Sequence, residues 1–240
     1  MDELSVKYKK EEEAPGDEPS YERIICGIDE AGRGPVIGPM VVVGVWADRE
    51  GEGRLRQMGV RDSKKHGKKK REELSEKIRR EFFYDFVVVN PEDIDALRET
   101  MSLNDLEIHI FAKIGRSRRA DVYYLDSADV DEGRFGRSFL GKMGFDADVV
   151  SEHEADVNYP VVSAASIVAK VERDSLLEEI RKEIEPELGV PLGSGYPSDE
   201  RTRLFIKKWI EKFGDVPPHT RRSWKTVQKI KADMKQQRFF

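Results

Sequence analysis

The sequence predicts an α/β fold followed by a small helical extension. Short apolar, β-branched runs typical of strands alternate with segments in which apolar residues recur every three or four positions, as in helices. After Pro186 the composition changes to Gly, Pro and Ser, which marks a boundary. We therefore expect a disordered charged segment over residues 1–20, a main domain over residues 21–185 and a helical extension over residues 186–240.

The expected strands are short runs rich in Val, Ile, Phe and Tyr. Only a Gly-rich segment ending at Pro39 separates the first two, so we expect them to pair as a hairpin. The third ends before Pro91, because the residue before a proline is restricted to extended conformations. The strands are expected at residues 23–29, 40–47, 83–89, 121–126 and 147–151.

Apolar residues at helical spacing predict the helices between and after these strands. Ser102 is placed to cap one of them. The longest, over residues 161–184, opens with the small residues SAAS, which permit close packing on a sheet. The marking residues are Leu74, Ile78 and Phe82; Leu103, Leu106, Ile110 and Ile114; Ala164, Ile167, Val168 and Val171, then Leu177, Ile180 and Ile184; and Ile206, Trp209, Ile210 and Phe213.

Cysteine usage and hydropathy indicate where the protein works. The only cysteine, Cys26, lies inside an apolar run, so no intramolecular disulfide forms and a reducing compartment is expected. The N-terminus is charged, and the longest apolar stretch, residues 40–46, is too short to cross a bilayer. We expect a cytoplasmic monomer.

The net charge of −5 argues against a nucleic-acid partner, but phosphate binding depends on local clusters rather than on the sum. Residues 61–71 (RDSKKHGKKKR) are almost wholly basic, and residues 221–238 carry far more Lys and Arg than acids. Each run is either a phosphate-contacting surface or an ordinary solvated face.

The segment DEAGRGP places two adjacent carboxylates, Asp29 and Glu30, at the end of the first expected strand. Buried like charges are costly unless a cation or a shared proton relieves them. A divalent metal ion is one explanation, and an ordinary acidic turn is the other. Gly32, Arg33 and Gly34 let the backbone turn sharply and present N–H groups to a phosphate or sugar.

Two further acids occupy comparable places in the sequence. Asp126 ends an expected strand, and Asp156 precedes the long helix, where an acid also favours the positive end of the helix dipole. Hard cations such as Mg²⁺ and Mn²⁺ prefer oxygen ligands, so these acids extend the same hypothesis. Spacing alone does not exclude the neighbouring acids Asp129, Asp131, Glu152 and Glu154.

Several motifs in series resemble ribonuclease HII, particularly its archaeal form. They run in order over most of the chain, from about Ile24 to Thr226. The motifs are DEAGRGPVIGP, DSKK at residues 62–65, LDS at 125–127, DVNYPVVSAASIVAKVERD at 156–174, GSGYPSD at 193–199 and RRSW at 221–224.

The resemblance implies a ribonuclease H-like fold, with a central mixed sheet flanked by helices and a C-terminal helical extension. It also implies an active site made of the acids Asp29, Glu30, Asp126 and Asp156, which would bind the metal. The family's bacterial members often have His directly before the Arg pair, where this chain has Thr220, so no catalytic role is given to the histidines. The residues implied to bind substrate are Gly32, Arg33 and Gly34 at the ribose 2′-hydroxyl, Lys64 at a phosphate, Tyr196 at the RNA to DNA junction, and Ser163 and Ser166 near the substrate path.

The expected activity is endonucleolytic cleavage of the RNA strand of RNA/DNA hybrids, and cleavage 5′ to ribonucleotides embedded in duplex DNA. Two divalent ions, Mg²⁺ or Mn²⁺, would activate a water and stabilise the departing oxygen, leaving 3′-hydroxyl and 5′-phosphate ends. Two rivals remain open at this point: a protein of the same fold that only binds nucleic acid, and a transposase-like or junction-cutting nuclease.

The chain ends in KQQRFF, with two aromatic residues on a basic, polar tail. This tail resembles a degenerate form of the peptide by which replication and repair enzymes bind a sliding clamp, with Gln236 at the usual aliphatic position. A sliding clamp that binds through Phe239 and Phe240 is therefore an expected partner, and hydrophobic packing of the Phe pair at the chain end is the alternative.

Overall fold

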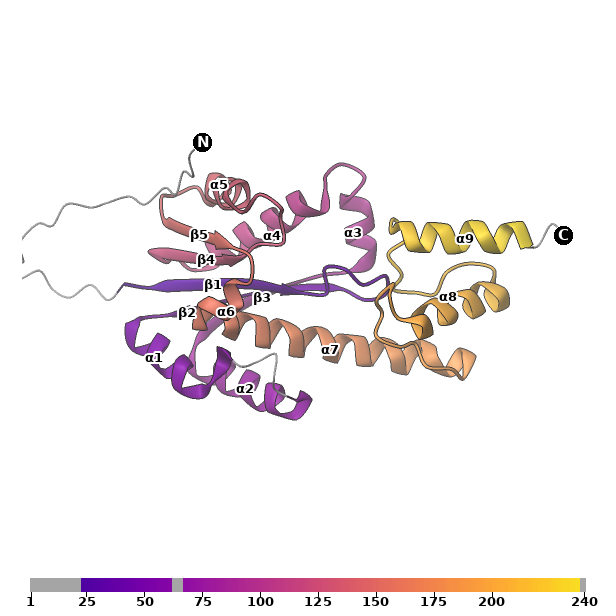
Figure 1. The fold of residues 1–240 in the computed structure, drawn as a ribbon, viewed down its shortest axis with the longest axis horizontal. Helices are drawn as coiled ribbons and strands as arrows, with labels where there is room; N and C mark the ends of the chain where they lie inside the picture. The colour runs from indigo at the N-terminus through magenta and orange to yellow at the C-terminus, as the bar shows by residue number, and fades with distance from the viewer. Residues whose placement is uncertain (1–22, 62–66, 238–240) are drawn as a thin grey trace, which may run out of the picture.

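The computed structural model describes residues 23–61 and 67–237, and its centre is a five-stranded mixed sheet of order β3-β2-β1-β4-β5 (Figure 1). β1, β2 and β3 are antiparallel neighbours, which confirms the hairpin, and β4 and β5 run parallel to β1. The expected mixed sheet is therefore confirmed. The strands are β1 (Ile25–Ala31), β2 (Met40–Ala47), β3 (Phe83–Val89), β4 (Val122–Asp126) and β5 (Asp148–Glu152).

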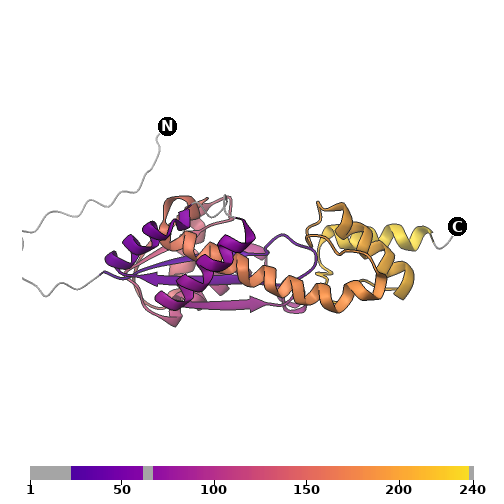
Figure 2. The same ribbon diagram turned by 90° about the horizontal axis from the view of Figure 1, so that it is seen from below.

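Helices cover both faces of the sheet (Figures 1 and 2). Side chains alternate along β2, so Val41, Val43 and Val45 pack with α1, α2 and α7, whereas Met40 and Val42 pack with α4 and α5 on the other face. The helices are α1 (Arg49–Met58), α2 (Lys68–Glu81), α3 (Pro91–Leu97), α4 (Leu103–Ser117), α5 (Glu132–Met143), α6 (Ala155–Asn158), α7 (Pro160–Leu188), α8 (Glu200–Phe213) and α9 (Lys225–Gln237).

The first turns of α7 pack directly on β1. A Cβ added to Gly27 would lie 2.4 Å from the carbonyl carbon of Val161 and 2.5 Å from the amide nitrogen of Val162. Ala164 and Ala165, the small residues of SAAS, are fully buried against the sheet. The close packing expected from these small residues is present, and it fixes α7 beside the strand that carries Asp29.

The C-terminal extension has a core of its own, separate from the two faces of the sheet. α7 continues past the sheet, and its second half packs with α8 and α9 (Figure 2). Val36 and Ile37, from the turn after β1, join this cluster. The extension is thereby attached to the loop that follows Asp29 and Glu30.

Several local expectations differ from the structure. β1 extends to Ala31, so both acids lie within it, and α7 continues through Pro186 to Leu188. Periodicity did not indicate α1, α3 or α5. α1 and α5 contain glycines, which lower helix propensity, and the side chains of Asp48 and Asp131 cap their N-termini by accepting backbone N–H bonds of 2.6 and 2.8 Å.

Two sequence expectations on single residues are confirmed. Cys26 is buried and free of a disulfide, and Ser102 caps α4 by accepting a 3.1 Å bond from the amide of Asp105. No helix in the described ranges is both long and apolar enough to cross a membrane. The expected disordered segment, residues 1–20, lies outside the described residues.

Candidate active site

The parallel pairing of β1 and β4 brings acids from distant parts of the chain together. Ile28 lies opposite Leu125 in the register, so the next residues, Asp29 and Asp126, are neighbours at the same edge of the sheet. Asp29 is buried, and Glu30 and Asp126 are half-buried. Three of the four predicted acids therefore come from two adjacent strands.

The fourth acid, Asp156, is buried in α6, the short helix that follows β5. The carboxylate of Asp126 accepts a 3.2 Å bond from the amide of Ala155, which holds the start of α6 at the end of β4. The hydroxyl of Ser163 donates to the backbone carbonyl of Asp156 from α7. The segment that carries Asp156 is thus attached both to the sheet and to the long helix.

Electrostatics show that these acids act on one another. Burial raises the pKa of Asp29 well above its ordinary value, and the nearby charges of Asp126 and Asp156 raise it further, against hydrogen bonds from the Ser166 hydroxyl and the Glu30 amide. Burial also raises the pKa of Glu30, followed by the charges of Glu107, Asp29 and Asp126. After burial, the strongest influences on both groups include other carboxylates.

The carboxylate oxygens of this cluster are suitable ligands for a divalent cation. Carboxylate oxygens are the ligands that Mg²⁺ and Mn²⁺ prefer, and a cation would relieve the repulsion that raises these pKa values. Within residues 23–61 and 67–237, no three or more His, Cys, Asp or Glu side chains are arranged to hold an ion by themselves. Mg²⁺ usually keeps waters and substrate phosphate oxygens among its ligands, so the acids fit a site that is shared with substrate.

The competing acids near Asp126 have structural partners. Asp129 is buried and pairs with Arg134, and bonds from Arg134 and from the amide of Asp131 lower its pKa. Asp131 caps α5. Neighbouring donors thus account for both residues.

Near Asp156, the competing acids also lie outside the cluster. Glu152 accepts a 3.0 Å bond from the Tyr159 hydroxyl, and Glu154 is exposed with a left-handed backbone, φ 55°. Neither is among the groups that act most strongly on the pKa of Asp29 or Glu30.

The turn at Gly32, Arg33 and Gly34 is held by a buried cation. Gly32 has φ +85°, and a Cβ there would lie 2.5 Å from the carbonyl oxygen of Pro39. The guanidinium of Arg221, which is fully buried, donates to three backbone carbonyls. The bonds run to Gly32 (2.5 Å), Arg33 (2.8 Å) and Gly38 (3.0 Å). Because its carbonyls are engaged by Arg221, the turn has a fixed backbone.

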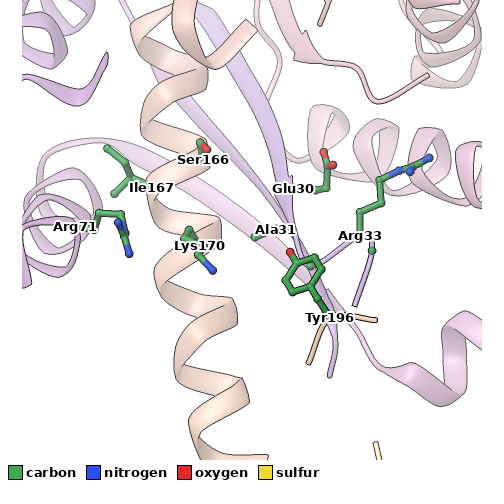
Figure 3. Close-up of a pocket in the computed structure, with 10 residues that line it drawn as sticks. Glu30, Ala31, Arg33, Arg71, Ser166, Ile167, Lys170 and Tyr196 are labelled. Carbon is green, nitrogen blue, oxygen red and sulfur yellow. The ribbon is translucent and has the colours of Figure 1, made fainter. Parts of the chain in front are cut away.

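A cavity of about 370 Å³ is lined by the turn and by one of the four acids, Glu30 (Figure 3). Glu30 lies at one wall, Ser166 and Lys170 project from α7 at the opposite wall, and the ring of Tyr196 also lines the cavity. A Cβ on Gly34 would lie 3.6 Å from the Tyr196 ring, so the turn and the tyrosine face each other. Arg71, from α2, adds a positive charge to the same cavity.

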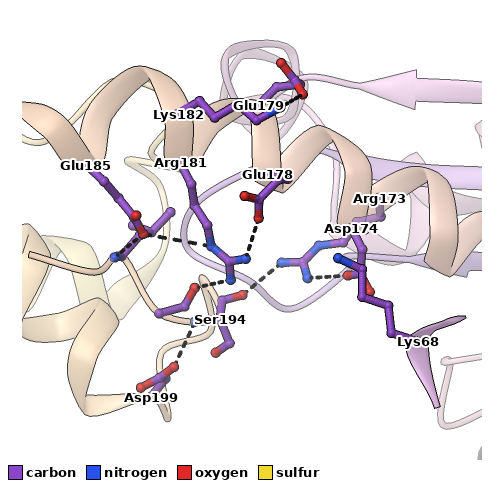
Figure 4. A network of polar contacts seen from close by, with 12 residues as sticks. Lys68, Arg173, Asp174, Glu178, Glu179, Arg181, Lys182, Glu185, Ser194 and Asp199 are labelled. Atoms are coloured by element: carbon purple, nitrogen blue, oxygen red, sulfur yellow. Dashed lines mark hydrogen bonds and ion pairs between the residues drawn. The ribbon is translucent and has the colours of Figure 1, made fainter.

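Arginines of α7 hold the loop GSGYPSD, which carries Tyr196; Figure 4 shows Arg173 and Arg181 beside Ser194 of this loop. Arg173 donates to the carbonyl of Ser194 at 3.1 Å, and Arg181 donates to the carbonyl of Gly193 at 2.6 Å. The guanidinium carbon of Arg173 lies 5.4 Å from the centre of the Tyr196 ring, a cation–π contact. The helix that packs on β1 therefore also sets the position of the aromatic ring.

The comparisons with known proteins agree with this geometry. A family model described as Ribonuclease HII matches residues 26–227. The chain belongs to the ribonuclease HII family. It is therefore an endoribonuclease of the type 2 ribonuclease H class, and the family implies activity on RNA/DNA hybrids. Ribonuclease HII of Methanocella arvoryzae is 45% identical over 217 residues, which covers 90% of this chain and 95% of that protein. The Thermococcus kodakarensis protein is 46% identical over 86% of this chain and 89% of its own length.

Solved structures confirm the fold. Ribonuclease H2 from Pyrococcus horikoshii matches with a TM-score of 0.82 and 39% identity, over 89% of this chain and 99% of that one. A structure of the PCNA:RNase HII complex from Archaeoglobus fulgidus matches with a TM-score of 0.78 and 42% identity, over 86% and 96% of the two chains. The ribonuclease H-like fold expected from the motifs is therefore confirmed for this member of the ribonuclease HII family.

The residues predicted to bind substrate in this ribonuclease HII chain divide into three groups. Gly32, Gly34, Ser166 and Tyr196 line the cavity, as does Arg33. The hydroxyl of Ser163 is fully buried and donates to backbone carbonyls, so its predicted substrate role stays a prediction. Lys64 lies outside the described residues.

Sequence reasoning missed four residues that shape this site: Arg71, Lys170, Glu107 and Arg221. Arg71 and Arg221 stand in basic segments, and Arg221 also in the motif RRSW, and neither feature distinguishes them from their basic neighbours. Glu107 lies on the apolar face of α4, and an acid at a core position of a helix is the signal that would have pointed to it.

Proposed function

We propose that this chain hydrolyses the RNA strand of RNA/DNA hybrids and cuts 5′ to ribonucleotides embedded in duplex DNA, leaving 3′-hydroxyl and 5′-phosphate ends. Family membership implies a divalent metal cofactor. We assign Mg²⁺ or Mn²⁺, two ions in the catalytic state, to Asp29, Glu30, Asp126 and Asp156. The convergence of these carboxylates at one edge of the sheet carries the proposal: beyond the effect of burial, the charges of Asp126 and Asp156 raise the pKa of Asp29, and those of Asp29 and Asp126 raise the pKa of Glu30.

The chemistry supplied by two bound divalent ions is activation of a water for in-line attack and stabilisation of the departing 3′ oxygen. The protein's own groups hold and select the substrate. Asp29 keeps its orientation through the Ser166 hydroxyl and the Glu30 amide. Lys170 and Arg71 line the cavity, where they supply positive charge toward phosphates.

Selection of RNA over DNA depends on the 2′-hydroxyl, because this group alone distinguishes the two sugars. The backbone of Gly32, Arg33 and Gly34 is suited to read it, since Arg221 engages the turn's carbonyls and fixes its peptide planes. Across the cavity, Tyr196 offers a ring for stacking at the RNA to DNA junction. Lys64 is assigned to a phosphate by the family resemblance.

A sliding clamp is proposed as a partner. The Archaeoglobus fulgidus relative has been solved in complex with PCNA, and this chain ends in Phe239 and Phe240, which lie outside the described residues. Deleting both residues should abolish binding to the clamp of the same organism while leaving cleavage of short duplexes unchanged. Equal clamp affinity of the two forms would contradict the proposal.

The direct test of the activity is cleavage of a labelled DNA duplex that contains one ribonucleotide, with Mg²⁺, Mn²⁺ or chelator. We expect one cut, 5′ to the ribonucleotide, only with metal, and no cutting of the matched all-DNA duplex. Asp126→Asn should abolish it, whereas Glu152→Gln, a neighbouring acid bound to Tyr159, serves as the matched control. Cutting in chelator, or duplex binding without any cleavage, would contradict the proposal.

A further inference from the structure

The side chain of Arg33 extends away from the Tyr196 ring and toward α4 (Figure 3). Its Nε donates to Glu107 at 3.0 Å, and its Nη2 donates to the side-chain oxygen of Asn104 at 2.5 Å. Asn104 and Glu107 are one turn apart on α4 and therefore face the same way. The guanidinium is thus held at two points by one helix.

This polar face of α4 also reaches the loop that follows Asp126. A side-chain hydrogen bond from Asn104 helps to lower the pKa of Asp129, and Asp129 in turn pairs with Arg134. Arg33 and Asp129 therefore share Asn104 as a partner. The ribose-facing turn and the loop after Asp126 are linked through the first turns of one helix.

Burial of the Glu107 carboxylate lowers the stability of the fold. Its side chain is fully buried among apolar neighbours on α4, which include Ile108 and Phe111. One carboxylate oxygen accepts from Arg33, and the carboxyl also interacts with that of Glu30, whose pKa its charge raises. A buried ion pair stabilises a fold poorly relative to apolar residues of the same size. Packing alone therefore does not account for a carboxylate here.

We propose that Glu107 is a positioning residue that sets discrimination between ribose and deoxyribose. It does so by fixing the Arg33 side chain, while Arg221 fixes the carbonyls of the same turn. With the Arg33 side chain and the carbonyls of the turn both held, the peptide planes of Gly32, Arg33 and Gly34 stay in one orientation toward the cavity. This role rests on the proposed reading of the 2′-hydroxyl by that turn.

The test compares Glu107→Ala and Glu107→Gln with Glu172→Ala. Glu172 is a matched control because it also pairs with an arginine, Arg79 of α2, at 2.6 Å, but where α7 packs against α2. With the single-ribonucleotide duplex we expect Glu107→Ala to lower kcat/KM roughly 10- to 100-fold, the loss of a hydrogen bond between charged groups. Glu107→Gln keeps a neutral acceptor for Arg33 and should recover most of the activity. Glu172→Ala should stay within about two-fold of wild type.

A binding measurement separates discrimination between ribose and deoxyribose from the cleavage step. In Ca²⁺, the affinity for the single-ribonucleotide duplex is divided by the affinity for the matched all-DNA duplex. We expect Glu107→Ala to lower this ratio several-fold and the Glu172→Ala control to keep it. If Glu107→Ala does not fold, Arg33→Lys tests the same link, because lysine cannot donate to Glu107 and Asn104 in a fixed fork.

A double-mutant cycle separates action through Arg33 from direct action on the acids. If Glu107 works by holding Arg33, Glu107→Ala has no further effect in an Arg33→Ala background. Additive losses, or a Gln variant as poor as the Ala variant, would overturn the inference. So would equal activity of Glu107→Ala and Glu172→Ala. If the wild-type protein does not cleave the single-ribonucleotide duplex, the proposed function itself is refuted.

Discussion

Acids at the edge of the sheet and acids in the C-terminal extension have opposite surroundings. Hydrogen bonds from the Ser194 amide and from Arg201 hold the pKa of Asp199 well below its usual range. Lys231 and Arg222 lower the pKa of Asp215 in the same way. At the sheet edge, burial and neighbouring carboxylates instead raise the pKa of Asp29 and of Glu30.

The contrast separates two uses of the same residue type. An acid that holds a loop or a helix end accepts hydrogen bonds from neighbouring donors, and its charged form stabilises the fold. Asp29 and Glu30 are instead buried and repelled by neighbouring carboxylates, so their charged forms lower the stability of the free protein. Such a cost is expected where the structure leaves the neutralising cation to be supplied from outside.

The largest effect is expected from Asp29→Asn. Cleavage should fall on the order of 1000-fold, because the amide removes a charged oxygen at the centre of the cluster. The melting temperature in chelator should stay the same or rise, since a repelled buried charge has been removed. Cleavage assays together with thermal unfolding measure both.

The control for this variant is Asp215→Asn, which removes an acid of the other class. A folded Asp29→Asn protein that cleaves at the wild-type rate would remove Asp29 from the site. A large loss of stability in Asp29→Asn would show that this carboxylate stabilises the fold, as the acids of the C-terminal extension do, and the two groups of acids would no longer differ.

The second effect is on stability. Arg221→Ala would leave the buried carbonyls of Gly32 and Gly38 and the partly buried carbonyl of Arg33 without their donor, so we expect the free energy of unfolding to fall by about 3 kcal/mol or more. Arg222→Ala is the matched control, because that side chain is half-exposed and pairs with Asp215 at the surface. Urea unfolding curves of the two variants should differ clearly. Similar curves would show that Arg221 does not hold the turn.

The third prediction concerns pH. A carboxyl whose pKa is raised by folding binds protons more tightly in the folded state. Its contribution to stability is complete below the unfolded pKa, near 4, and is lost as pH rises through the folded pKa. In chelator, the difference in melting temperature between Asp29→Asn and wild type should therefore grow from about pH 4 toward neutrality. A difference that shrinks over this range would reverse the sign assigned to Asp29.

The smallest effect is expected at Asp215 itself. Its lowered pKa adds stability above the unfolded pKa, and this stability is lost as pH falls through the folded pKa. The side chain is half-exposed, so solvent screening limits the contribution to under about 1 kcal/mol. Asp215→Asn should lower the melting temperature slightly at pH 7 and leave cleavage unchanged. Loss of cleavage would place this acid with the sheet-edge group.

Much of the fold was readable from the sequence because periodicity reports burial. The strands, the long helix and the hairpin were predicted from apolar patterns, and the Ser102 cap was predicted from its side-chain chemistry. α1 and α5 were missed because glycines interrupt them, and their caps and tertiary contacts outweigh low propensity.

The acids of the candidate site could be proposed from the sequence, but the residues that support them could not. Asp126 and Asp129 are three residues apart, and only the structure shows that one faces the cluster while the other pairs with Arg134. Arg221 and Glu107 act over 74 to 189 positions of sequence separation, which no local pattern encodes. The pairing of distant residues was supplied by the fold.

The most direct test of the central claim is calorimetric titration of Mn²⁺ into metal-free protein that holds an all-DNA duplex. The account predicts uptake by wild type and by Asp215→Asn, and strongly weakened uptake by Asp29→Asn and Asp126→Asn. Equal uptake by all four proteins, or none by wild type, would contradict the assignment of the sheet-edge acids to divalent ions.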